Sequence, residues 1–185
     1  MRSVLSFAGL FLLICDPLSA VPHSLAIPRL STKDFRTEGL YEGGKRIPAN
    51  IEAMRVSDHK GVERWVVDFS DALSRKLGKV APQFQVRYQP GEKGIGATGE
   101  SVFFRPAKFL LTFRGVRQNY LDAEKVKALV KKSRYVKDIT LYPAIEDGDL
   151  VIELTLTDDV AFEAHQPVQK EGHLVLDLKP AVITQ

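Results

Sequence analysis

Two stretches of the chain share one pattern of apolar and polar residues, and this internal repeat constrains the fold more than any other feature of the sequence. Residues 51–69 align without gaps on residues 136–154, at a constant shift of 85 positions. Trp65 then matches Leu150, and both stand in runs in which every second residue is apolar. Because such alternation is typical of strands with one buried face, the repeat predicts two copies of one β-unit.

Both copies continue in the same order beyond the matched stretch. A strand centred on a phenylalanine follows, Phe84 in the first copy and Phe162 in the second, and an apolar-rich strand closes each copy, residues 109–113 and 174–178. A unit of about four strands is too small to bury its own apolar face. We therefore predict a mostly β protein, in which two similar small sheets, one from each copy, pack face to face as a sandwich.

A single segment, at about residues 120–133, has helical periodicity. Its apolar residues fall on one helical face: Ala123, Val126, Leu129 and Val130. Asn119 or Asp122 is expected to cap its N-terminus. This segment predicts one α-helix that connects the two copies.

The N-terminal residues have the order of a secretory signal. A positive charge precedes an apolar run that is too short to span a bilayer, and a small residue stands at Ala20. We predict that residues 1–20 are a secretory signal that is removed on export. Association with a membrane is expected only if Cys15 is lipidated, and the bulky Ile14 before it disfavours a lipoprotein signal.

The rest of the chain divides by composition. Residues 21–50 contain three prolines and three glycines without a sustained period, and we predict a flexible N-terminal arm. The repeat places one β-domain at residues 51–180, followed by a short tail at 181–185. A long loop is expected at residues 89–108 within the domain.

Several motifs point away from common chemistries. Residues 94–99 satisfy the pattern GxGxxG, but a strand-like run follows, whereas a dinucleotide fingerprint needs a helix there; a mobile loop is expected. Residues 146–149 resemble half a calcium loop without its later glutamate, and they are interpreted as a hairpin turn, as is Asp158-Asp159.

The remaining signals for catalysis, metal and nucleic acid are weak. The four histidines lack the spacing of a zinc site and are interpreted as scattered surface residues. No serine stands in a Gly-x-Ser-x-Gly setting. The net charge of +3 is too small to indicate nucleic acid. We predict no catalytic residue, no metal ligand and no cofactor.

Three strands of the sequence resemble those of a known family. Residues 51–56 (Ile-Glu-Ala-Met-Arg-Val), 64–69 (Arg-Trp-Val-Val-Asp-Phe) and 173–178 (His-Leu-Val-Leu-Asp-Leu) look like the repeated strands of AMIN domains, which are found in bacterial envelope proteins. The resemblance covers about residues 50–180. It implies a periplasmic β-sandwich that tethers an envelope protein to peptidoglycan. Since neither an amidase nor a secretin segment follows, we expect a standalone module.

The resemblance and the exported address together predict a non-catalytic envelope module. We expect it to bind peptidoglycan or to scaffold a cell-wall or secretin-type assembly. Guanidinium groups hold carboxylates in a bidentate fork, so Arg55 and Arg64 are the preferred contacts for the stem peptides, with Arg114 and Arg117 as second choices. The alternatives are a protein-binding accessory subunit that uses a sheet edge or an exposed aromatic residue, and a carrier of a hydrophobic ligand held between the sheets.

Overall fold

The computed structural model describes residues 35–77, 81–144, 148–167 and 172–181. The predicted signal segment and Cys15 lie outside these residues, as does most of the C-terminal tail. Among the helices in the described residues, none has the length and apolar character needed to cross a membrane.

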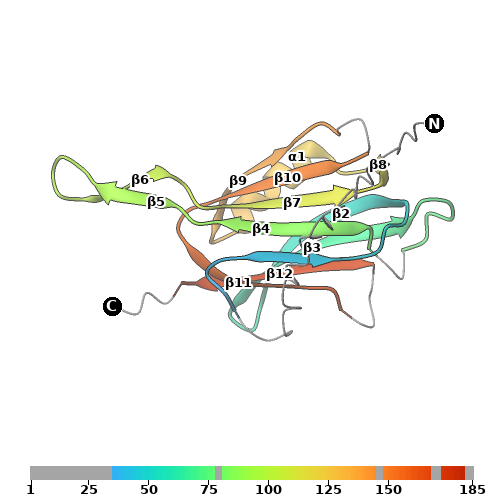
Figure 1. The fold of residues 1–185 in the computed structure, drawn as a ribbon, viewed down its shortest axis with the longest axis horizontal. Helices are drawn as coiled ribbons and strands as arrows, with labels where there is room; N and C mark the ends of the chain where they lie inside the picture. The colour runs from blue at the N-terminus through green and yellow to red at the C-terminus, as the bar shows by residue number, and fades with distance from the viewer. Residues whose placement is uncertain (1–34, 78–80, 145–147, 168–171, 182–185) are drawn as a thin grey trace, which may run out of the picture.

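The protein is a mostly β sandwich, as the repeat predicts (Figure 1). A first sheet has the strand order β11-β12-β3-β2-β8, a second has the order β1-β4-β7-β10-β9, and β5 and β6 form a separate two-stranded ribbon. The strands are β1 (Leu40–Gly43), β2 (Ala49–His59), β3 (Val62–Asp71), β4 (Gln83–Gln89), β5 (Glu92–Ile95), β6 (Ser101–Arg105), β7 (Lys108–Arg114), β8 (Val116–Asn119), β9 (Val136–Leu141), β10 (Leu150–Leu156), β11 (Val160–His165) and β12 (His173–Pro180).

The two copies of the repeat are exchanged between the sheets. In the first copy, β2 and β3 lie in the first sheet, while β4 and β7 lie in the second; in the other copy, β9 and β10 lie in the second sheet and β11 and β12 in the first. The order β11-β12-β3-β2 therefore corresponds to β4-β7-β10-β9. The prediction of one copy per sheet is wrong. A ribbon of two strands is marginal in water, and pairing with a ribbon of the other copy builds a wider sheet.

The connections within each copy explain this exchange. The chain passes from β3 to β4, and from β10 to β11, by crossing from one sheet to the other. Asp158-Asp159 lies on the second of these crossings, so its interpretation as a hairpin turn is wrong. The turn predicted at residues 146–149 does join an antiparallel pair, β9 and β10, and its residues 146 and 147 lie outside the described part of the chain.

Strand register shows that the ungapped alignment is displaced by two residues. Met54 stands opposite Val67 on β3, whereas Ile139, the match of Met54, stands opposite Leu154 on β10. Val67 therefore corresponds to Leu154, at a shift of 87 rather than 85 positions. The pairing of β7 with β10 and of β12 with β3 gives the same correspondence. Two extra residues in the β9–β10 turn account for the displacement.

The corrected register changes which core positions are equivalent. Trp65 corresponds to Ile152, and the predicted equivalence of Trp65 and Leu150 is wrong, although all three residues are buried. The shift of 85 does hold for β2 and β9, the strands that begin each copy. Glu52 on β2 and Lys137 on β9, which are 85 positions apart, both lack a paired residue on the neighbouring strand. A β-bulge at the same place in each copy is independent evidence for the repeat.

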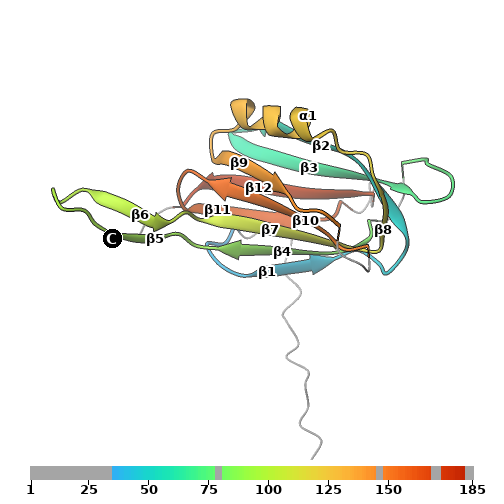
Figure 2. The same ribbon diagram turned by 90° about the horizontal axis from the view of Figure 1, so that it is seen from above.

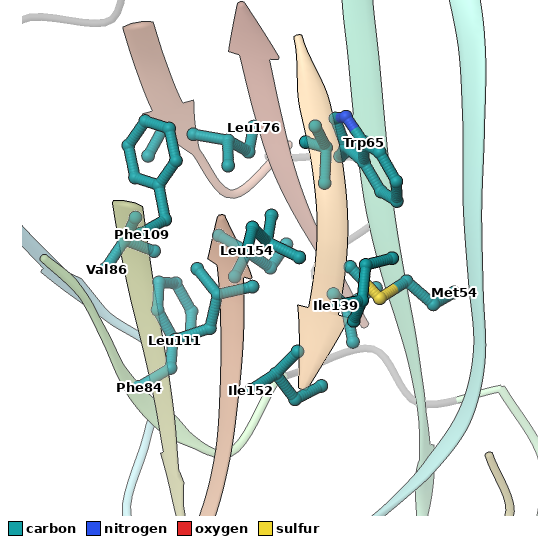
Figure 3. Close-up of a cluster of buried hydrophobic side chains, with 14 of the residues drawn as sticks. Met54, Trp65, Phe84, Val86, Phe109, Leu111, Ile139, Ile152, Leu154 and Leu176 are labelled. Atoms are coloured by element: carbon teal, nitrogen blue, oxygen red, sulfur yellow. The ribbon is translucent and has the colours of Figure 1, made fainter. Parts of the chain in front are cut away.

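Large side chains fill the space between the sheets (Figure 3). Tyr88, Phe109 and Phe162 contact one another, with ring centroids 5.0–5.4 Å apart, and join β4, β7 and β11. Trp65 and Ile152 are at most 1% exposed. This dense packing gives no support to the expectation of a hydrophobic ligand between the sheets.

A short helix covers the open side of the sandwich beside β2 and β9 (Figure 2). It comprises α1 (Ala123–Ala128) and a 3-10 turn, η1 (Leu129–Lys132), and Asp122 caps it by accepting from two backbone N–H groups. Val126 is buried, as expected, but Ala123 is exposed. The buried Glu63 of β3 ties this segment to the first sheet, since it accepts hydrogen bonds from the indole of Trp65, the hydroxyl of Ser133 and the backbone of Arg134.

Parts of the predicted arm belong to the sandwich. β1 pairs with β4, and β2 begins at Ala49, which is 1% exposed. The prediction of a flexible arm at 21–50 is therefore wrong for these residues, and those before Phe35 lie outside the described part of the chain. The pattern was missed because the four-residue β1 is too short to show a period.

The predicted loop at 89–108 is a hairpin that projects from one end of the molecule (Figures 1 and 2). We call residues 92–105 the β5–β6 arm. Gly94 stands in β5, and a β-carbon there would lie 2.0 Å from the ring of Phe104. The ring thus covers the glycine backbone. The glycines of residues 94–99, which made this segment look like a loop in the sequence, belong to the hairpin. Since a strand follows residues 94–99, the context of a dinucleotide fingerprint is absent there.

Candidate functional site

Arg55 and Arg64 lie on the outer face of the first sheet, each in a bidentate ion pair. Arg55 binds Asp68 through Nε–Oδ2 and Nη2–Oδ1 contacts of 3.0 Å each. Arg64 binds Asp177 through Nε–Oδ1 at 2.7 Å and Nη2–Oδ2 at 2.6 Å. These hydrogen bonds raise the pKa of both guanidinium groups above the usual value. A ligand carboxylate would therefore have to compete with a carboxylate of the protein itself.

Two histidines lie on the same outer face. The Nδ1 atom of His173 is 2.5 Å from Oδ1 of Asp68, and His165 Nδ1 is 3.9 Å from Glu163. Their side chains are 16% and 22% exposed. These two histidines are partly buried on the outer face, where carboxylates lie against their rings. His59 is exposed, and His23 lies outside the described residues.

Glu163, His165 and Asp177 place one potential ligand atom each within 4.8 Å of the others. Carboxylates and imidazole are common ligands of divalent transition metals. Both oxygens of Asp177, however, accept hydrogen bonds from Arg64, so a cation would have to displace a guanidinium group. We interpret the cluster as part of the ionic network on the outer face.

Arg114 lies in a different setting. It is the last residue of β7, and this end of β7 lies at the end of the sandwich opposite the β5–β6 arm (Figures 1 and 2). There a surface pocket of about 780 Å³ opens between the β1–β2 connection, the start of β4, the end of β7 and the start of β10. We call it the arginine pocket. Its lining residues are Arg46, Ile47, Pro48, Gln83, Arg114, Gly115 and Asp149.

Backbone hydrogen bonds hold the walls of the arginine pocket together. Lys45 N–H donates to Ala81 at 3.1 Å, and Val116 N–H donates to Gly148 at 3.0 Å. Gly44 has a φ of +74°, and a β-carbon there would lie 1.9 Å from the carbonyl oxygen of Pro82. The β1–β2 connection thus approaches β4 as closely as it does because residue 44 is a glycine. Backbone contacts between the connecting segments, and not side chains alone, therefore position the walls.

The charges of the arginine pocket are only partly compensated. Arg114 Nε lies 3.9 Å from Asp149 Oδ2, which is too long for a hydrogen bond. Arg46 is exposed. Among the described lining residues there are thus two arginines and one acidic residue, and both members of the Arg114–Asp149 pair keep hydrogen-bonding groups for a ligand. The Arg114 side chain is 51% exposed, so it is accessible from solvent.

The structure separates the four predicted contacts. Arg55 and Arg64 are paired on the outer face, Arg114 lines the arginine pocket, and Arg117 is exposed on β8 without lining it. Sequence reasoning missed Arg46 because it stands in the segment expected to be flexible. It also missed Asp149, which was expected only to form a turn. No local pattern marks either residue, because the pocket combines four connections far apart in the chain.

The β5–β6 arm is a second surface feature. At its base, Lys93 Nζ is 2.7 Å from Asp158 and 3.5 Å from Asp159, which raises the pKa of Lys93 and lowers that of Asp158. The hydroxyl of Tyr88 donates to Asp159 at 3.0 Å. Ile95, farther along the arm, is 81% exposed, and Phe104, on the opposite strand near the base, is 73% exposed. The base is thus fixed to the sandwich, while large apolar side chains face solvent.

No family model matches the chain, and no curated protein matches its sequence. The similarity to AMIN domains therefore stays a prediction, and the function is argued from the site.

Proposed function

We propose that the protein is an exported, non-catalytic module of the bacterial envelope that binds peptidoglycan. The observation that carries this proposal is the arginine pocket, which is lined by the exposed Arg46 and Arg114, and in which Asp149 is the one acidic residue among the described lining residues. Peptidoglycan presents carboxylates on its stem peptides, and guanidinium groups bind carboxylates through paired hydrogen bonds. The AMIN-like strands and the signal-like N-terminus support the same conclusion.

The geometry changes which arginines serve this function. Arg114, a second choice on the sequence alone, becomes the first-choice contact, and Arg46 joins it. Arg117 remains a second choice. Arg55 and Arg64 are assigned to the outer-face ion pairs, since Asp68 and Asp177 already occupy their guanidinium groups. Each exposed ionic contact contributes only about 0–1 kcal/mol. Useful affinity would therefore come from many sites along a repeating polymer.

Sedimentation with purified sacculi tests this function. At low salt the wild-type protein should sediment with the sacculi, and at high salt the bound fraction should fall, because exposed charges are screened. Albumin in the same tube controls for trapping. Wild-type protein that stays in the supernatant at low salt would refute peptidoglycan binding.

A protein-binding accessory subunit of an envelope complex is the second candidate. The observation that favours it is the β5–β6 arm, which carries the exposed Ile95 and Phe104 on a ribbon of two strands. Each strand of such a ribbon has one edge free for pairing with another chain. Cross-linking in intact cells tests this candidate: Phe104→Ser should abolish a discrete cross-linked species, and Leu73→Ser, at a site 95% exposed, should not.

A further inference from the structure

The charges in the arginine pocket suit a ligand of mixed charge better than a simple anion. A pocket for a plain carboxylate needs only its guanidinium groups, yet Asp149 also lines this one and lies 3.9 Å from Arg114. An anion placed between the two would meet Asp149 as a like charge. A ligand that carries an ammonium group beside its carboxylate would turn this repulsion into an attraction.

We propose that the arginine pocket binds an α-amino-acid group, with its carboxylate at Arg114 and Arg46 and its ammonium at Asp149. Such a group is present at the free end of a diamino dicarboxylic acid in a stem peptide. This inference rests on the proposed function, and it identifies which chemical part of the polymer the pocket recognises.

The lining of the pocket has a place for each part of this ligand. The Arg114–Asp149 contact is too long for a hydrogen bond, so binding replaces a weak contact by charge-assisted hydrogen bonds on both sides. Ile47 and Pro48 form part of the same wall, and Ile47 is 37% exposed. Their apolar surfaces suit the methylene chain of a diamino acid. The Gln83 amide adds a neutral donor and acceptor.

Two small probes separate recognition of an amino-acid group from attraction of an anion. Free 2,6-diaminopimelate carries a carboxylate and an ammonium at each end, whereas pimelate has the same chain and carboxylates without the ammonium groups. NMR titration of the wild-type protein should give a dissociation constant for diaminopimelate about tenfold below that for pimelate, as expected for one hydrogen bond between charged groups. Equal affinity for the two probes would overturn the proposal.

Single substitutions in the pocket test whether Arg114 binds the carboxylate of the ligand and Asp149 binds its ammonium group. Arg114→Ala should raise the dissociation constant for diaminopimelate by about tenfold or more. Asp149→Asn keeps the size of the side chain and removes its charge. This variant should bind diaminopimelate no more tightly than it binds pimelate. Arg87→Ala, at an exposed position on β4 outside the pocket, should leave both titrations unchanged. If Asp149→Asn keeps the preference for diaminopimelate while its amide spectrum is that of a folded protein, the assignment of the ammonium is wrong.

The sacculus and small-molecule experiments can fail separately. If wild-type protein sediments with sacculi but does not distinguish the two probes, peptidoglycan binding stands and the amino-acid pocket is refuted. If it distinguishes the probes but does not sediment, the pocket stands and the proposed function is refuted.

Discussion

The arginines of the outer face and those of the arginine pocket are the same residue type in opposite settings. On the outer face, Arg64 shares two short hydrogen bonds with Asp177, a residue 113 positions away in the chain. In the pocket, Arg114 has its nearest described carboxylate at 3.9 Å, beyond hydrogen-bonding distance. A paired guanidinium group stabilises the fold, whereas one with unused donors is available to a ligand. The difference lies in the tertiary partners and not in the local sequence.

The largest effect should come from the core that holds both regions in place. The comparison depends on β3 turning Arg64 outward and Trp65 inward. Trp65→Ala should lower the free energy of unfolding by about 3–5 kcal/mol, and Ile152→Ala, at the equivalent position, by about 2–5 kcal/mol, because each removes buried surface and leaves a cavity. Urea denaturation measures both losses, and an unchanged midpoint for either variant would contradict the burial of that side chain between the two sheets.

The next largest effect should come from the buried ion pair of the outer face. Arg64→Ala leaves Asp177 without its partner, and the Asp177 side chain is 7% exposed. Breaking a fully buried pair costs about 3–5 kcal/mol; since Arg64 is partly exposed, we expect about 2–4 kcal/mol. Thermal and urea unfolding should show this loss. The double variant Arg64→Leu, Asp177→Leu is the control, because it removes the unpaired charge, and it should recover part of the stability.

A smaller effect is expected from the more exposed pair. The Arg55 side chain is 59% exposed, so solvent weakens its attraction to Asp68. Arg55→Ala should cost about 1 kcal/mol or less. If it destabilised the protein as much as Arg64→Ala, burial would not be what separates the two pairs.

The smallest effect on stability should be found in the pocket. Arg114→Ala should change the free energy of unfolding by about 0.5 kcal/mol or less, because its side chain is half exposed and forms no hydrogen bond with Asp149. Urea unfolding beside Arg64→Ala makes the comparison direct. A large loss of stability in Arg114→Ala would show that this arginine supports the fold.

The sequence predicts the fold to the extent that a pattern is local. Alternation identified the strands around Trp65 and Ile152, and the repeat identified a sandwich. The exchange of ribbons between sheets could not be predicted, because both arrangements bury the same apolar faces. The two-residue displacement was also hidden, since a shift of two keeps every side chain on the same face of a strand.

The candidate site was less predictable than the fold. Arg55, Arg64 and Arg114 were selected as arginines on or after family-like strands, and nothing near them in sequence shows which are paired. Arg46 could not be found, since its role depends on the β1–β2 connection being held against β4. Pairing across sheets and pockets between loops are both set by contacts between residues far apart in the chain.

One measurement tests the central claim that the arginine pocket, rather than the outer face, binds the wall polymer. Two double variants lose the same charge: Arg46→Ala, Arg114→Ala in the pocket, and Arg55→Ala, Arg87→Ala outside it. Sedimentation with sacculi at low salt should show a severalfold loss of bound protein for the pocket variant and wild-type binding for its control, with both variants folded by circular dichroism. Equal loss in the two variants, or full binding by the pocket variant, would contradict the account.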